Sequence, residues 1–158
     1  MSEMKKILSV SEAFARYSAL CARREYCQHD LADKMRRNGM QEQQIAEVLS
    51  ALEHEDYVND KRYCESFVHD KMAFSHWGRA RIRMELRKRH LPSEIISSAM
   101  DTIDEDIYRE QLLELLDNYG KTVRAKSDYE RYNKMIRYAC NHGYEYDIVV
   151  ELMEDHDL

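Results

Sequence analysis

Residues 78–100 read GRARIRMELRKRHLPSEIISSAM, and their apolar positions recur at the same offsets in two other parts of the chain. In this copy the six positions are Ile82, Leu86, Leu91, Ile96, Ala99 and Met100. The equivalent positions 51 residues earlier are Leu31, Met35, Met40, Ile45, Val48 and Leu49. Those 53 residues later are Met135, Ala139, Tyr144, Val149, Leu152 and Met153. Any helical protein shows such spacing occasionally, but six matched positions in three copies indicate a threefold repeat.

Within each copy the spacing predicts two amphipathic helices that meet at a break. The break falls at Gly39, His90 and Gly143. A glycine after the last helical residue commonly takes the left-handed conformation that ends a helix, so Gly39 and Gly143 suit this position. His90 does not suit it, and we expect Pro92 to stop the helix instead, because proline cannot continue one.

A further, leading helix is predicted before each of these pairs. In the first copy it begins near Ser11, which serves as the N-cap, and in the second it follows Asn59 or Asp60. In the third copy the acidic run 104–106 precedes it. Acidic residues are favoured there because the helix dipole places positive charge at the N-terminus.

The sequence therefore predicts an all-α protein made of three tandem three-helix repeats. Such units cannot bury their apolar faces alone, so we expect them to stack into an elongated, curved helical array. After an N-terminal extension at 1–10, the repeats are expected at 11–56, 57–103 and 104–158. An array of this kind presents an extended surface to a large partner and seldom encloses a deep pocket.

The composition agrees with this architecture. Of 158 residues, 44% are hydrophobic and 34% charged, with four glycines and one proline, which argues against disorder and against β-rich or Rossmann-type folds. No apolar run approaches the roughly 18 residues of a membrane span, and the N-terminus lacks the features of a signal peptide. The four cysteines form no CxxC pair, so we expect free thiols. We expect a soluble, cytoplasmic protein with no membrane partner.

Motifs of catalysis are absent from the sequence. It contains no glycine-rich phosphate loop, no GxSxG and no HExxH. Cys27 and His29 form a weak metal pair and are expected to occupy a helix start instead. The acidic cluster at 101–106 could in principle hold Mg²⁺, as in a nuclease, but an acid-capped helix N-terminus follows from the dipole alone. We therefore predict a protein that is not an enzyme and that uses no metal or other cofactor.

Charge is distributed unevenly along the chain. The formal net charge is -6, which at first argues against nucleic acid as a partner. Residues 1–100 hold 17 Lys and Arg against 15 Asp and Glu, whereas 101–158 hold 7 against 15, giving +2 and -8. Within 79–90 there are six basic residues and one acidic residue. The average therefore conceals a local basic segment.

This basic segment is the most informative candidate site. Arg79, Arg83 and Arg87 recur every fourth residue and are expected to form one stripe on a helix, while Arg81 and Lys88 lie on another outward face. Glu85 is spaced to pair with Arg81 and Arg89. An ordinary solvated face is the simpler reading, but the density of charge, with Trp77 just ahead, favours a surface for an acidic protein groove or a phosphate backbone. Other arginines are expected to extend this surface, namely Arg23, Arg24, Arg36 and Arg37.

Several ordered motifs resemble the RecX family of recombination regulators. They are ALCARREY at 19–26, YVNDKRY at 57–63 and GRARI at 78–82, and the match is specific over about 17–100. The resemblance implies three tandem three-helix repeats. It also implies binding to the RecA–single-stranded DNA filament and restraint of its growth, ATPase and strand-exchange activities, with single-stranded DNA bound indirectly or weakly by a monomer. The residues at family motif positions are Arg23, Arg24, Asp60, Arg62 and Trp77, of which Asp60 is more simply a helix cap.

The sequence departs from this family at two helix ends. The family commonly has a small hydroxyl residue near Cys27 and a glycine at the position of His90. The third repeat is also unusually acidic. One hypothesis is that repeats one and two dock in the filament groove, while the third contacts basic patches on recombinase subunits or repels DNA.

Other functional classes remain open from the sequence. Two helices joined by a short turn resemble helix-turn-helix units, so a DNA-binding module is one alternative. Tight binding to DNA alone, falling steeply with salt, would distinguish it. A general helical-repeat adaptor for an unrelated protein is the other alternative, and a magnesium nuclease is a distant further one.

Overall fold

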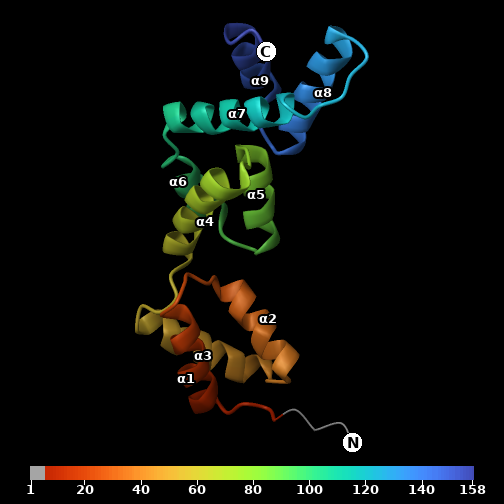
Figure 1. Cartoon of the computed structure of the whole chain (residues 1–158). Helices are drawn as coiled ribbons and strands as arrows, with labels where there is room; N and C mark the ends of the chain where they lie inside the picture. Colours follow the sequence, from red (N-terminus) through yellow and green to blue (C-terminus); the bar gives the residue numbers. More distant parts are fainter. Residues whose placement is uncertain (1–5) are drawn as a thin grey trace, which may run out of the picture.

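The structure is a computed structural model that describes residues 6–158. Over that range the chain forms nine α-helices and no strand, as predicted. The helices stack into an elongated, bowed molecule with the N-terminal helices at one end and the C-terminal helices at the other (Figure 1). Their bounds are α1 Val10–Cys21, α2 Gln28–Asn38, α3 Glu42–His54, α4 Asp60–Ser75, α5 Arg79–Lys88, α6 Ser93–Met100, α7 Glu105–Gly120, α8 Asp128–Asn141 and α9 Tyr146–Asp155.

Of the predicted starts of the three leading helices, those of α4 and α7 are confirmed and that of α1 is shifted. Asn59 caps α4 by accepting from the Arg62 backbone N–H, and Asp104 caps α7 in the same way. The expected cap at Ser11 is wrong, because Ser9 caps α1 and forms a capping box with Glu12. Of the predicted extension at 1–10, residues 1–5 lie outside the described residues, whereas Leu8 is buried in the core of the first three helices.

The repeated apolar positions form the core, as the offsets predicted. Of the eighteen positions in the three copies, seventeen are buried, and the remaining one, Leu49, is half-buried against the same core. The two positions before the break are fully enclosed in all three copies: Leu31, Met35, Ile82, Leu86, Met135 and Ala139. Burial of these side chains is what holds each helix pair together, since apolar burial is the main favourable term in folding.

All three breaks use the same backbone conformation. Gly39 and Gly143 have φ of 101° and 97°, as expected for glycines that end helices. The expectation for His90 is wrong: it has φ of 54° and ends α5 in the left-handed region itself. Packing of the residues before and after His90 imposes this conformation. Leu86 and Leu91 are both buried in the core, so the chain must turn sharply at the residues between them. Histidine tolerates the left-handed region better than β-branched residues do.

The interior is divided into two cores. Twelve buried residues form one cluster in the described chain, eight of them in α1–α3 and four in the segments next to these helices. A second cluster of twenty-three runs without interruption from α4 through α9. The first three helices therefore form one body, and the remaining six form another.

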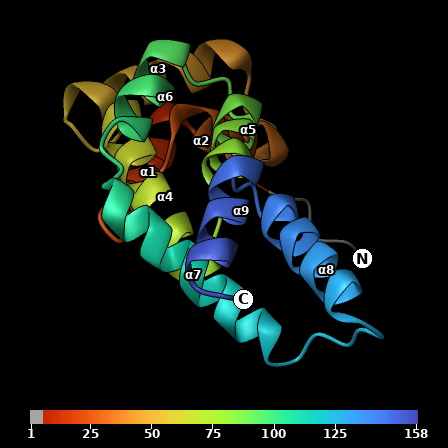
Figure 2. The same cartoon turned by 90° about the horizontal axis from the view of Figure 1, so that it is seen from above.

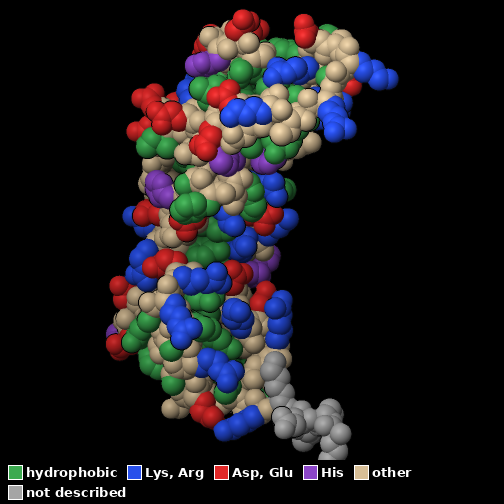
Figure 3. All heavy atoms as spheres, viewed as in Figure 1, with side chains coloured by type: hydrophobic (Ala, Val, Ile, Leu, Met, Phe, Trp, Pro, Cys, Tyr) green, Lys and Arg blue, Asp and Glu red, His purple; other side chains and the backbone are tan. Residues whose placement is uncertain are grey.

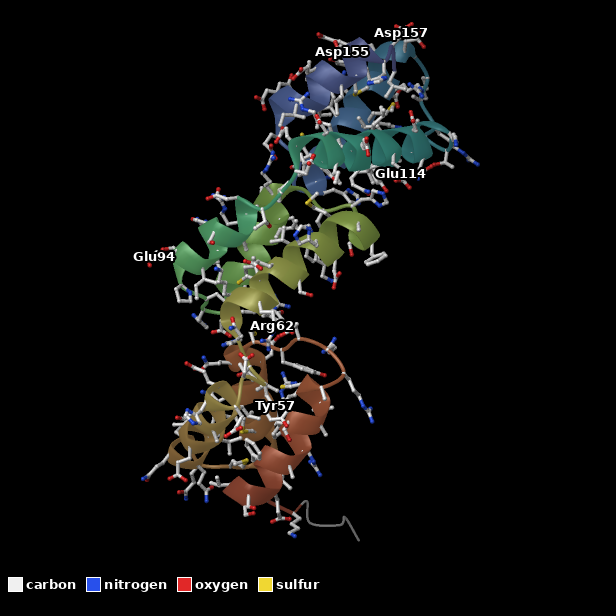
Figure 4. The ribbon with its side chains drawn as sticks, turned by 90° about the vertical axis from the view of Figure 1, so that its left-hand side faces the viewer. Tyr57, Arg62, Glu94, Glu114, Asp155 and Asp157 are labelled. Atoms are coloured by element: carbon white, nitrogen blue, oxygen red, sulfur yellow. The ribbon has the colours of Figure 1, made fainter. Side chains whose placement is uncertain are left out.

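Polar bridges join these two bodies. Arg62 on α4 pairs with Glu25 at 2.6 Å and lies at the junction in Figure 4. Arg89 at the end of α5 pairs with Asp30 on α2 at 3.4 Å. The Cys27 side chain is buried in the larger core and supplies an apolar contact across the same junction.

The middle helix of each repeat lies on one side of the molecule. Figures 1 and 2 place α2, α5 and α8 along this side, and we call it the second-helix side. Equivalent helices fall on the same side because each repeat stacks on the next in a similar orientation. No helix within residues 6–158 is long and apolar enough to cross a membrane.

Candidate docking surface

Charge is segregated by helix position. The middle helices α2, α5 and α8 carry 3, 5 and 3 Lys and Arg against 2, 1 and 2 Asp and Glu, a total of 11 - 5 = +6. The last helices of the repeats, α3, α6 and α9, carry no Lys or Arg and 3, 1 and 4 acidic residues, a total of -8. Lys and Arg side chains accordingly follow the second-helix side in Figure 3. The elongated molecule therefore presents a basic side to any large anionic partner.

Helix α5 supplies the most concentrated part of this side. Arg83 and Arg87 form no ion pair with any residue that the structure describes, and Arg87 is exposed. Lys88 is exposed as well and pairs with Glu85 at 3.1 Å. Exposed pairs of this type contribute little to stability and exchange readily for a better partner. These three side chains are available for an intermolecular contact.

Arg81 does not make the predicted pair with Glu85. Its guanidinium lies 4.3 Å from the centre of the Trp77 ring, and Lys71 lies 4.8 Å from the same ring. Glu85 does pair with Arg89, at 3.5 Å, as predicted, and its other partner is Lys88 rather than Arg81. Trp77 is thus half-buried between two cations and packs edge-on against Phe67 and the larger core.

Arg79 is committed inside the molecule. It pairs with Glu105 and, at 2.7 Å, with Glu145, and its guanidinium lies 3.9 Å above the ring of the buried Tyr108. The Tyr108 hydroxyl donates to Glu145 and accepts from the Arg79 backbone N–H. Burial, together with the bond to Glu145, raises the pKa of Tyr108. Only 26% of the Arg79 side chain is exposed, so this residue fastens α5 to α7 and to the start of α9.

The motif residues of the first two repeats divide in the same way. Arg23 is exposed and unpaired among the described residues, and Arg24 is exposed with its guanidinium 4.3 Å from the Tyr26 ring. The Arg62 guanidinium bonds within the molecule, to Glu25 and also to the Asp56 carboxylate and backbone. The hydrogen bond from Arg62 to Glu25 raises the pKa of Arg62.

Asp60 caps a helix in a different repeat from its own. Cys27, at the N-cap of α2, makes no side-chain capping bond. The Asp60 carboxylate accepts from the Gln28 backbone N–H at 3.1 Å and so satisfies the α2 terminus from outside. Burial raises the pKa of Asp60. The prediction of Asp60 as a cap is therefore correct in kind, but the helix that it caps is α2, since Asn59 caps α4.

The two weak metal candidates have other positions in the structure. Cys27 lies at the start of α2 and Asp104 caps α7, each as the simpler reading predicted. No group of three or more His, Cys, Asp or Glu side chains in the described part of the chain is arranged to hold a metal ion. The four cysteines are free.

Sequence reasoning missed the basic residues of α8. Arg137 is exposed on this helix and makes no ion pair within residues 6–158. In a sum of charge along the chain, the basic residues of α8 are averaged with the acidic residues of α7 and α9. Counting by position within the repeat would have found them.

These features define a class of protein: an all-helical repeat protein with an extended basic side. Comparison with known proteins identifies the family. The model of the second three-helix domain of RecX matches residues 59–100. The regulatory protein RecX of Mannheimia succiniciproducens is 30% identical over 133 residues, covering 84% of this chain and 86% of the relative. The chain belongs to the RecX family of regulatory proteins.

Solved structures agree with this assignment at the level of fold. The crystal structure of RecX from Lactobacillus salivarius superposes with a TM-score of 0.79 at 23% identity, covering 94% of this chain and 96% of that one. A second crystal structure of a regulatory protein RecX gives 0.83 at 16% identity, covering 92% and 73%. Some relatives are longer: the chain spans 61% of the RecX of Caldanaerobacter subterraneus, to which it is 32% identical, and 58% of a Clostridium botulinum RecX.

Proposed function

We propose that this protein binds the RecA–single-stranded DNA filament in the cytoplasm and restrains its growth, its ATPase activity and strand exchange. Membership of the RecX family supports a regulatory role, and the resemblance to that family supplies RecA as the partner. The observation that carries the docking mode is the segregation of charge, +6 on the middle helices against -8 on the last helices of the repeats. A nucleoprotein filament is a long anionic object, and a long basic side complements it.

The proposed mechanism is a clamp that catalyses no reaction. A bowed helical array contacts neighbouring recombinase subunits at once and holds their relative orientation. Because turnover in a filament is coupled to changes between subunits, fixing that orientation lowers ATPase activity without contact with the nucleotide. Capping a filament end stops extension at low ratios of regulator to recombinase. We propose that the protein acts as a monomer, since one chain already spans three repeats.

The docking residues we propose are cations of the second-helix side, half-buried in the case of Arg81 and Arg83 and otherwise exposed, and two exposed cations just after α1. On α5 these are Arg83, Arg87 and Lys88, with Arg81 at the edge of the set because its guanidinium is stacked on Trp77. On the first repeat they are Arg23 and Arg24. The internal contacts of Arg62, Trp77 and Arg79 support a structural role for these three, which positions the set without touching the partner.

The test is the single-stranded-DNA-dependent ATPase rate of RecA from the same organism, titrated with this protein. We expect strong inhibition below one regulator per recombinase. Arg83→Glu with Arg87→Glu should weaken inhibition at least about tenfold, because two attractive contacts become repulsive, which removes roughly 1.4 kcal/mol or more of binding free energy.

The matched control changes net charge equally at another place. Arg16→Glu with Lys61→Glu alters two exposed side chains on α1 and α4, outside the middle helices. This control should inhibit like the unmodified protein. No inhibition by the folded protein at several-fold excess over RecA would overturn the proposed function. Equal losses in both variants would show that net charge alone matters and would remove α5 as the docking element.

A further inference from the structure

The charge of the third repeat is itself divided. Residues 121–137 contain six of the seven Lys and Arg of 101–158 and only two of its fifteen acidic residues, a net charge of 6 - 2 = +4. The rest of 101–158 has one basic residue against thirteen acidic ones. The basic part covers the connection from α7 to α8 and most of α8, which project together at the upper right of Figure 1. The third repeat is acidic overall, but this end of it is basic.

Most of these cations have no partner within the molecule. Lys121, Arg124, Lys126 and Arg137 are exposed and form no ion pair among the described residues. Lys134 pairs with Glu130 at 3.0 Å, and the Arg131 guanidinium donates to the Gly120 carbonyl. Besides Asp128 and Glu130, the acidic residue that lies nearest to these cations in the sequence is Asp117, near the end of α7. Unpaired cations clustered over a few turns are the electrostatic footprint of an anionic ligand.

Aromatic rings lie among these cations. Tyr119 and Tyr138 stack with their centres 3.9 Å apart and their planes 6° from parallel. Both rings line a shallow groove of about 410 Å³ together with Arg124, Lys134 and Arg137. Tyr129, at the start of α8, is 80% exposed and lines an adjoining groove that Arg137 also borders. Because Tyr129 is so exposed, its ring contributes little to the packing of the protein and is free to contact a ligand.

We infer that this surface, which we call the 121–137 patch, binds single-stranded DNA through phosphates and stacked bases. Lys121, Arg124, Lys126 and Arg137 contact the phosphates, while Tyr129 and an outer face of the stacked Tyr119–Tyr138 pair offer π-faces to bases. Single strands are bound by this combination of a basic track and aromatic platforms, without sequence preference. An acidic protein surface would match the cations but would leave the aromatic rings unused. The inference builds on the proposed function and gives the third repeat a direct contact with the nucleic acid of the filament.

The test needs no recombinase. Binding of a fluorescein-labelled oligothymidylate to the full chain is followed by anisotropy over a range of salt concentrations. Arg124→Glu with Arg137→Glu should weaken binding at least about tenfold and lower the magnitude of the salt slope by about 1.4, since each single-strand phosphate contact contributes roughly 0.7. Tyr129→Ala should weaken binding about fivefold with the salt slope unchanged, because stacking releases no counterions.

Controls keep the result specific to the patch. Arg16→Glu with Lys61→Glu carries the same change in net charge on the first helices and should bind the oligonucleotide like the unmodified chain. If the first double variant does not fold by circular dichroism, Lys121→Glu with Lys126→Glu tests the same prediction in the exposed connection. Sodium polyglutamate serves as the competitor that represents an acidic protein.

Each adverse result overturns the inference separately from the proposed function. Unchanged DNA binding in the patch variants, equal loss in the control, or no binding by the unmodified chain at low salt would remove the 121–137 patch as a DNA site. Stronger competition by polyglutamate than by unlabelled oligothymidylate would assign the patch to a protein partner instead. Inhibition of the RecA ATPase, measured independently, decides the proposed function in every one of these cases.

Discussion

His90 shows how one residue meets a requirement that the repeat imposes. The two equivalent positions are glycines in the left-handed region, and His90 adopts that region with φ of 54°. Its ring packs edge-on against His29 on α2, with ring centres 4.9 Å apart. The Cβ of an L-residue in this conformation approaches the following carbonyl, which costs about 1 kcal/mol.

The substitution His90→Gly should therefore raise the free energy of unfolding by up to about 1 kcal/mol, since glycine has no Cβ to be strained in the left-handed region. His90→Ala is the matched control, because it removes the same ring but keeps the Cβ, and it should give no gain. Urea unfolding curves of the three proteins provide the measurement. A glycine variant no more stable than the alanine variant would show that the His90 backbone is unstrained.

Thiol reactivity also depends on single residues. Cys27 and Cys64 are fully buried, and burial raises the pKa of each thiol to about 12. Burial raises the pKa of the half-buried Cys21 and Cys140 as well. Because the thiolate is the reactive species, we expect two thiols of the native protein to react with Ellman's reagent near pH 8 and the other two to react only after unfolding.

The double variant Cys21→Ser with Cys140→Ser assigns the two classes. In its native state it should show almost no reaction, and in denaturant it should show two thiols. Reaction of all four thiols at one rate in the native protein would contradict the burial of Cys27 and Cys64.

At the scale of the element, α5 is docked on the third repeat through its first residues. The Gly78 N–H donates to the His142 carbonyl at 2.7 Å, and the Ala80 N–H donates to the Gly143 carbonyl at 3.1 Å. A Cβ at Gly78 would overlap the backbone of Gly143 and Tyr144. The turn between α8 and α9 therefore fixes where α5 begins, and with it the direction in which Arg83 and Arg87 project.

Gly78→Ala should cost about 2 kcal/mol of stability, because rigid backbone cannot yield to the added methyl group. Gly120→Ala is the matched control: its Cβ would meet only the ends of the Arg131 and Met135 side chains, which can move. The control should be nearly neutral in thermal unfolding. Equal Tm values for the two variants would show that α5 is not held by this contact.

For the whole molecule, the important feature is the division into two cores. The core of α1–α3 has twelve buried residues in the described chain and the core of α4–α9 has twenty-three, and mainly polar bridges join them. Cooperative units tend to coincide with continuous cores, and the smaller one is expected to be less stable. Trp77, the only tryptophan, packs against the larger core.

Urea unfolding should therefore occur in two steps. Circular dichroism, which reports all helices, should begin to change at lower urea than Trp77 fluorescence, which reports the larger body. Leu31→Ala, in the smaller core, should lower the first transition by about 3 kcal/mol and leave the fluorescence transition in place. Coincident transitions for both signals would mean that the polar bridges make the two bodies one cooperative unit.

The sequence by itself determined the all-helical class, the threefold repeat and the burial of seventeen of its eighteen apolar positions, because helical periodicity is a local property and the same pattern occurs three times. Other core residues, such as Leu8, Tyr26 and Tyr108, lie outside that pattern and were not predicted. The sequence also identified α5 as the basic helix, and it placed the starts of α4 and α7 at Asn59 or Asp60 and at the acidic run 104–106, where Asn59 and Asp104 are the caps. The limits of the repeats at 56 and 103 stay predictions.

Only the tertiary structure decided which cations are free. Arg79 meets Glu145 across 66 residues of chain, Arg62 meets Glu25 across 37, and Arg81 turns to Trp77 rather than to Glu85. The same holds for Asp60, which caps a helix 32 residues away, and for the separation of the 121–137 patch from the acidic helices beside it in sequence. Spacing along a helix defines which neighbours lie one turn away. Ion pairs and caps between repeats depend on how the repeats stack, and that is fixed by the packing of the whole chain.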